Sequence, residues 1–172
     1  MNLERALSNK RREMLPMYRF SSLCVLVTLV AFASPMHGRA DDSKDVILVI
    51  ANKAVPETSL SRDELRPLFQ SKMSSLPSGT EVRVFNLPEA DSARRGFDAA
   101  TLGLDPERVA RYWIDRKIRG GDRPPQTVPS GAAMVKVVGK TAGAIGYVDS
   151  HVSLDASVKV IAKVINGQLV KP

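Results

Sequence analysis

The chain has 172 residues, a formal net charge of +7 and one cysteine. Residues 1–40 carry six Lys/Arg and two Asp/Glu, which leaves 19 basic and 16 acidic residues and a net charge of +3 after position 40. This mild excess suits a protein that meets small anions, and it does not require nucleic acid or a membrane surface as partner. The segment 41–172 contains no cysteine, so its core must hold it without disulfides.

Residues 1–40 have the pattern of a secretory signal peptide. A basic segment precedes the apolar run 20–33, and small residues follow, so that cleavage is expected after Ala33 or Ala40. The run is shorter than the ~20 apolar residues that a membrane-spanning helix needs, which makes an uncleaved anchor the less favoured alternative. We therefore expect a protein secreted to the periplasm, with one folded domain over 41–172.

The first half of this domain alternates strand and helix patterns. VILVIA at 46–51 is a continuous apolar run rich in β-branched residues, which predicts a strand buried on both faces. A helix should begin at Ser61, because Glu64 can reach back to its amide in a capping box. The alternating residues 81–87 predict a second strand, and 92–101 predict a helix that ends at a glycine.

Helices and strands continue through the second half. A helix should begin at Asp105 and Pro106, an N-cap acid followed by proline, and end near Arg119. Asn166-Gly167 is a strong hairpin turn pair. The other expected elements are a loop over 120–125, a helix capped by Ser130, and strands over 143–148, 158–165 and 168–170. Helices interleaved with strands in this way predict an α/β fold.

Patterns for catalysis or metal binding are absent from the sequence. Its two histidines are His37 and His151, and no Cys/His cluster has metal-ligand spacing. The serines near His151 lack the nucleophile-elbow context of a hydrolase. GGDRPP at 120–125 lacks the Lys-Ser/Thr ending of a nucleotide-binding loop. We therefore expect no enzyme activity, no metal and no cofactor.

The helix expected after residue 105 carries a charged stripe and a tryptophan. The stripe consists of Arg108, Arg111, Asp115 and Arg119. Two interpretations remain open for it: a solvated face with i,i+4 ion pairs, or a basic patch for an acidic partner. Trp113 lies at helical spacing with Val109, and we expect its large ring to anchor the core.

Ser92 stands at the start of the helix expected over 92–101, after the polar run NLPEAD. The first turn of a helix exposes unpaired amides and a partial positive charge. A hydroxyl there can cap the helix, or it can bind an oxyanion together with the amides. The local sequence is compatible with both interpretations.

Three stretches together resemble the phosphate ABC transporter substrate-binding proteins. SLSRDELRPLFQSKMSSLPSGTEVRVFNLP resembles a helix–turn–strand segment of that family, EADSARRGF lies where the family has its Ser-Gly-Thr phosphate-binding helix start, and AGAIGYVDS resembles its Gly-Ala-Ile-Gly-Tyr strand. The resemblance covers about residues 46–150. It implies an α/β fold that forms a single lobe of a type II periplasmic binding protein, with a mixed sheet flanked by helices.

The same resemblance implies a function. Ser92 matches the family serine, whereas Ala93 and Arg94 replace its glycine and threonine, and these three residues are the expected contacts for phosphate or a similar small oxyanion. A membrane transporter or sensor would be the partner, and a single lobe leaves open a homodimer that rebuilds a cleft. The alternative is a ligand-free interaction or accessory module of the cell envelope that kept the fold.

Overall fold

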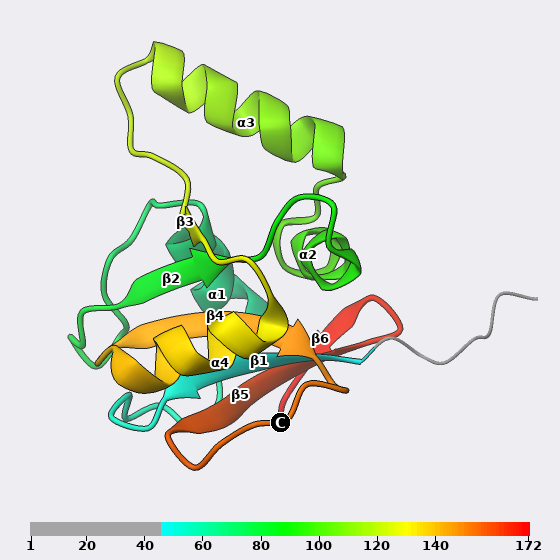
Figure 1. Ribbon diagram of the computed structural model, residues 1–172. Coiled ribbons are helices and arrows are strands. Elements are labelled where there is room, and N and C mark those ends of the chain that lie inside the picture. Colours follow the sequence, from blue (N-terminus) through cyan, green and yellow to red (C-terminus); the bar gives the residue numbers. More distant parts are fainter. Residues whose placement is uncertain (1–45) are drawn as a thin grey trace, which may run out of the picture. The chain divides into compact units, whose positions relative to one another are not determined.

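The computed structural model describes residues 46–172, so the predicted signal peptide lies outside the described residues. The helical elements are α1 (Arg62–Phe69), α2 (Ser92–Phe97), the π-helix η1 (Asp98–Leu102), α3 (Pro106–Ile118) and α4 (Gly131–Lys140), shown in Figure 1. The strands are β1 (Ile47–Asn52), β2 (Arg83–Asn86), β3 (Gln126–Thr127), β4 (Ala144–Asp149), β5 (Val158–Ile165) and β6 (Gln168–Val170). Among residues 46–172, no helix has the length and hydropathy needed to cross a bilayer.

The six strands form one mixed sheet in the order β3-β2-β4-β1-β5-β6. Strand β1 runs antiparallel to both of its neighbours, β4 and β5, whereas β2 runs parallel to β4 and β3. The predicted burial of β1 on both faces is confirmed, because Val49, Ile50 and Ala51 are fully buried. The expected α/β fold with a mixed sheet flanked by helices is therefore the fold of this chain.

Strand β4 shows how helices cover the two faces of the sheet. A side chain at Gly146 would collide with Met134 of α4. The next residue, Tyr147, packs instead against Phe69 of α1 and Phe97 of α2. Since successive residues of a strand point to opposite faces, α4 covers one face and α1 with α2 covers the other, an arrangement that can be followed in Figure 1.

Gly143, just before β4, allows the close approach of another segment. Its φ is +71°, and a Cβ there would overlap the carbonyl oxygen of Glu81. We expect Gly143→Ala to lower the free energy of unfolding by more than the ~1–2 kcal/mol that a left-handed backbone costs other residues. Gly79→Ala is the matched control, because Gly79 has a φ of +83° and no atom within 4 Å of an added Cβ. Urea denaturation of both variants compares them, and equal losses would contradict the role given to Glu81.

Several local predictions are confirmed. The amide of Ser61 donates to Glu64 Oε2 over 2.7 Å at the start of α1, and the Ser130 hydroxyl accepts from the Ala133 amide at the start of α4. Asn166 and Gly167 have positive φ values of 54° and 73° between β5 and β6. Each of these signals depends on residues only a few positions apart, so the local sequence is sufficient to predict it.

Helix α3 is held to the rest of the domain along one side only, and it lies apart from the sheet in Figure 1. Val109 is its one buried residue. The Tyr112 hydroxyl donates to the Gln70 carbonyl over 2.9 Å, and Arg116 donates to the Ser71 carbonyl over 3.3 Å. Trp113 is only half-buried, so the prediction that it anchors the core is only partly met, and one side of α3 remains open.

Candidate functional site

The start of α2 follows the carboxyl end of β2 after a short loop. Leu87 is the residue after β2, and the loop ends at Asp91, the N-cap of α2. In α/β folds, ligands often bind beyond the carboxyl ends of strands, where helices begin. Ser92, Ala93 and Arg94 lie at such a position.

The N-cap of α2 is Asp91, whereas the capping interpretation of the sequence placed it at Ser92. The Asp91 carboxylate accepts a hydrogen bond from the Ala93 amide over 2.9 Å, and the Asp91 carbonyl accepts from the Arg95 amide over 3.2 Å. Ser92 is the first helical residue, and its side chain is exposed. The Asp91 carboxylate thus already accepts from the Ala93 amide, which is one of the three groups expected to contact an oxyanion.

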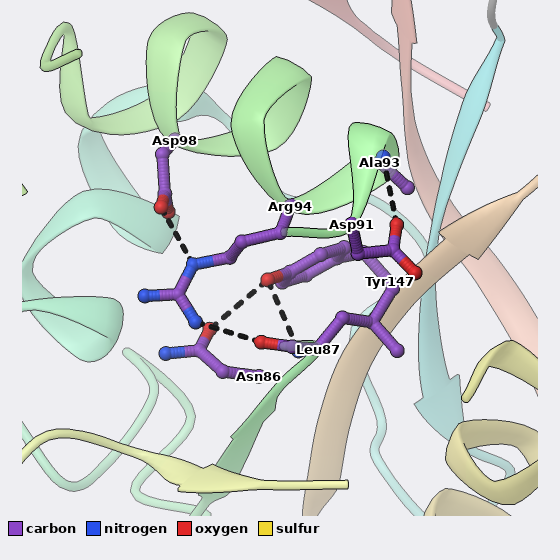
Figure 2. A network of polar contacts seen from close by, with 7 residues as sticks. All are labelled: Asn86, Leu87, Asp91, Ala93, Arg94, Asp98 and Tyr147. Carbon is purple, nitrogen blue, oxygen red and sulfur yellow. Dashed lines mark hydrogen bonds and ion pairs between the residues drawn. The ribbon is translucent and has the colours of Figure 1, made fainter. Parts of the chain in front are cut away.

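Arg94 points into the protein, as Figure 2 shows. Its Nε atom donates to Asp98 Oδ2 over 2.6 Å, and its NH1 atom donates to the Leu87 carbonyl over 2.9 Å. The Arg94 and Asp98 side chains are only 6% and 8% exposed. The guanidinium charge is therefore matched inside the protein and is not presented to solvent beside Ser92, although the Arg94 amide remains part of the first helical turn.

Burial and charge act in opposite directions on this ion pair. Burial raises the pKa of the Asp98 carboxyl, and the adjacent Arg94 guanidinium offsets only part of that effect. For Arg94, burial acts to lower the pKa, but the adjacent Asp98 carboxylate acts in the opposite direction, and the pKa is raised overall. The Arg94 guanidinium therefore stays charged. Removal of Asp98 would leave this buried charge without a counter-ion, which is strongly destabilising.

Tyr147 of β4 completes the network beneath the start of α2 (Figure 2). Burial raises the pKa of Tyr147, so its hydroxyl keeps its proton. That hydroxyl donates to Asn86 Oδ1 over 3.2 Å and accepts from the Leu87 amide over 3.3 Å. Leu87 is thus held through its amide by Tyr147 and through its carbonyl by Arg94, which fixes the loop that leads to α2.

The structure brings Ser92, Ala93 and Arg94 together at one helix start and gives them different surroundings. First-turn amides of a helix lack acceptors within the helix. The Ala93 amide is bonded to Asp91. Ser92 is the exposed residue of the three, whereas Ala93 and Arg94 are buried, at 4% and 5% exposure. Asp91 was a detectable cap, because Asp is among the preferred N-cap residues.

Other candidate groups do not assemble into a site. Residues 46–172 contain no group of three or more His, Cys, Asp or Glu side chains suited to a metal. His151 is exposed and lies against Asp149, two residues before it. On α3, Arg108 pairs with Asp105 and Arg111 with Glu107 on the exposed surface, as in the solvated-face interpretation, whereas the described residues hold no acid within ion-pair distance of Arg119.

Comparisons with known proteins support the fold. No family model matches the chain, and no curated protein has a significantly similar sequence. An ABC-type phosphate transport receptor from Vibrio cholerae matches in structure with a TM-score of 0.53 and 20% sequence identity, over 68% of this chain and 45% of that one. A protein described as a phosphate ABC transporter substrate-binding protein from Clostridium perfringens, solved with bound phosphate, matches with a TM-score of 0.53 and 18% identity, over 68% and 44%.

These likenesses confirm the fold expected from the sequence resemblance. This chain has the fold of part of each of these two solved structures. It spans a little under half the length of both solved structures, which agrees with the expectation of a single lobe.

Proposed function

We propose that residues 41–172 form a secreted, non-enzymatic binding module that takes phosphate or a similar small oxyanion at the start of α2. The Ser92 hydroxyl and the amides of Ala93 and Arg94 are its contacts, and the Asp91 carboxylate is an internal competitor that the anion must displace. The observation that carries this proposal is the exposed Ser92 at the first position of α2, beyond the carboxyl end of β2, where first-turn amides lack acceptors within the helix. The description of both fold neighbours as phosphate transport proteins, one with phosphate bound, supports it.

The number of available donors limits the affinity. A hydrogen bond to a charged group contributes about 1.5–3 kcal/mol, and binding must offset the freedom that the anion loses. Millimolar affinity already requires about 4 kcal/mol net. Since Asp91 must first leave the Ala93 amide, we expect the module alone to bind phosphate weakly. Tight binding would need a second wall, supplied by a membrane transporter or sensor or by a second copy of the chain.

Calorimetric titration of the mature protein with phosphate tests this proposal. We expect millimolar or weaker binding by the unmodified protein, and further weakening in Ser92→Ala. Asp91→Ser keeps a capping oxygen but removes the competing charge, so it should bind phosphate at least about fivefold more tightly, a gain of roughly 1 kcal/mol at a separation of about 4 Å in water.

The matched control is Asp105→Ser. Asp105 caps α3 in the same way, by accepting from the Arg108 amide over 2.9 Å, so this variant makes the same change of charge and cap elsewhere in the protein. Its phosphate affinity should equal that of the unmodified protein. The proposal fails if Asp91→Ser gives no heat at tens of millimolar phosphate, or if the two variants change affinity equally.

The ligand-free interaction module remains the second candidate, and a specific observation favours it. Asp91 occupies the Ala93 amide, and Arg94 is turned inward to Asp98, so the helix start is partly satisfied by the protein itself. An envelope partner that remains bound after phosphate depletion, in both the unmodified protein and Ser92→Ala, is the result that would favour this candidate over oxyanion binding.

A further inference from the structure

Helix α3 and the loop after it form an open hollow away from the start of α2. The hollow has a volume of about 660 Å³, and it is lined by Trp113, Ile114, Lys117, Gly121, Asp122, Arg123 and Pro124. We call this the α3 surface and include Ile118, one helical turn beyond Ile114. A hollow of several hundred Å³ is large enough for side chains of a partner.

The α3 surface has an apolar part that is held in a fixed orientation. Ile114 is 57% exposed and Ile118 is 78% exposed, and Trp113 beside them is half-buried. The opposite side of α3 is fastened to the domain through the hydrogen bonds of Tyr112 and Arg116. Helix α3 therefore cannot easily turn these apolar side chains inward, and they remain available to a partner.

The surroundings of this apolar part are basic. Among residues 46–172, no acid lies within ion-pair distance of Lys117, Arg119 or Arg123, whereas the nearby Asp122 is paired with Arg116 over 2.8 Å. Arg123 also lines an adjoining hollow of about 540 Å³ together with Lys72 and Arg83. Five cationic side chains thus lie along or beside the α3 surface: Lys72, Arg83, Lys117, Arg119 and Arg123. Two acids lie among them, Asp122, which lines both of these hollows, and Asp115, which lines a neighbouring hollow with Arg119.

We propose that the α3 surface binds an acidic segment of a partner protein, which places an apolar side chain against Trp113 and Ile114 and its carboxylates beside Lys117 and Arg123. Charge complementarity selects an acidic partner, and apolar anchors in the centre with charges at the rim are the arrangement of protein interfaces. A second copy is disfavoured, since it would bring the same net positive charge. A lipid surface is disfavoured, because a flat bilayer would leave the hollow unfilled.

Trp113 provides a direct readout, since it is the only tryptophan of the chain. The probe is a synthetic peptide without tryptophan, rich in Glu and Asp, with Leu and Phe at helical spacing. A second peptide has the same charge, with Ala at the apolar positions. We expect the first peptide to shift the Trp113 emission to shorter wavelength and to bind at least tenfold more tightly than the second.

Substitutions on the α3 surface and on α4 test where the peptide binds. Lys117→Glu and Arg123→Glu should each weaken binding of the first peptide by about tenfold, and Ile114→Ser should weaken it as well. Lys136→Glu on α4 is the matched control and should change the affinity less than twofold, because Lys136 is exposed on the other face of the sheet. Circular dichroism shows whether each variant has folded, and Asp91→Ser should leave peptide binding unchanged, which separates this inference from the oxyanion proposal.

The inference is overturned if the peptide causes no shift at millimolar concentration, if both peptides bind equally, or if Lys136→Glu weakens binding as much as Lys117→Glu. It is also overturned if vesicles of phosphatidylglycerol and phosphatidylcholine shift the emission while the peptide does not, because that result would assign the surface to a membrane.

Discussion

Asp98→Ala is expected to lower the free energy of unfolding by about 3–5 kcal/mol, the usual cost of removing one partner of a buried ion pair. Asp98 receives a 2.6 Å hydrogen bond from Arg94, and both side chains are less than a tenth exposed. Without Asp98, the Arg94 guanidinium would remain charged in a buried place, because deprotonating arginine is far too costly. The loss should appear in chemical denaturation as a lower midpoint with an unchanged slope.

The double variant Arg94→Met with Asp98→Leu distinguishes pairing from general disruption. Replacing both partners of a buried ion pair by apolar residues of similar volume is often nearly neutral. We therefore expect the double variant to be more stable than Asp98→Ala. If it is as unstable as the sum of the two single substitutions, the buried pair does not have the energetic role assigned to it.

Phe97→Ala should lower the free energy of unfolding by a similar amount, about 3–5 kcal/mol, because it removes a large buried ring and leaves a cavity. Phe97 is fully buried. Its ring stacks on Tyr147 with centroids 4.0 Å apart and an interplanar angle of 9°, and it meets Phe69 at 4.6 Å. This contact fixes α2 against the sheet, so the variant should also weaken the phosphate binding that we propose at the start of α2.

Two further variants serve as controls for this prediction, one with a milder change at Phe97 and one with a change at an exposed residue. Phe97→Leu keeps most of the buried volume and should cost clearly less than Phe97→Ala. Ile118→Ala removes an apolar side chain that is 78% exposed, and it should change the stability by no more than about 0.5 kcal/mol. An equal loss in Phe97→Ala and Ile118→Ala would show that burial in the aromatic cluster does not hold α2 in place.

Much of the fold could be predicted from the sequence, because its signals are local. The apolar run of β1, the capping box at Ser61 and the Asn166-Gly167 turn each depend on a few neighbouring residues. The π-helix η1 and the two-residue strand β3 were not predicted. The sequence 92–101 has a helical pattern that does not distinguish α from π hydrogen bonding, and β3 is too short to show alternation.

The candidate site was harder to predict, because it depends on which way side chains point. Helical spacing puts Arg94 and Asp98 four residues apart, which is compatible with an exposed pair or a buried one. The structure buries the pair, since the Leu87 carbonyl and Tyr147 lie on that side of α2. The Gly-Ala-Ile-Gly-Tyr resemblance thus has a structural basis: Gly146 makes room for α4, and Tyr147 secures the loop before α2.

The amide chemical shift of Ala93, followed by NMR during a phosphate titration, tests the oxyanion proposal most directly. We expect phosphate to move the Ala93 signal in a saturable way as the Asp91 carboxylate leaves. The same titration should saturate at lower phosphate in Asp91→Ser, and potassium chloride at equal ionic strength should have no such effect. An Ala93 signal that stays in place in both proteins, while the fold remains intact, would contradict it.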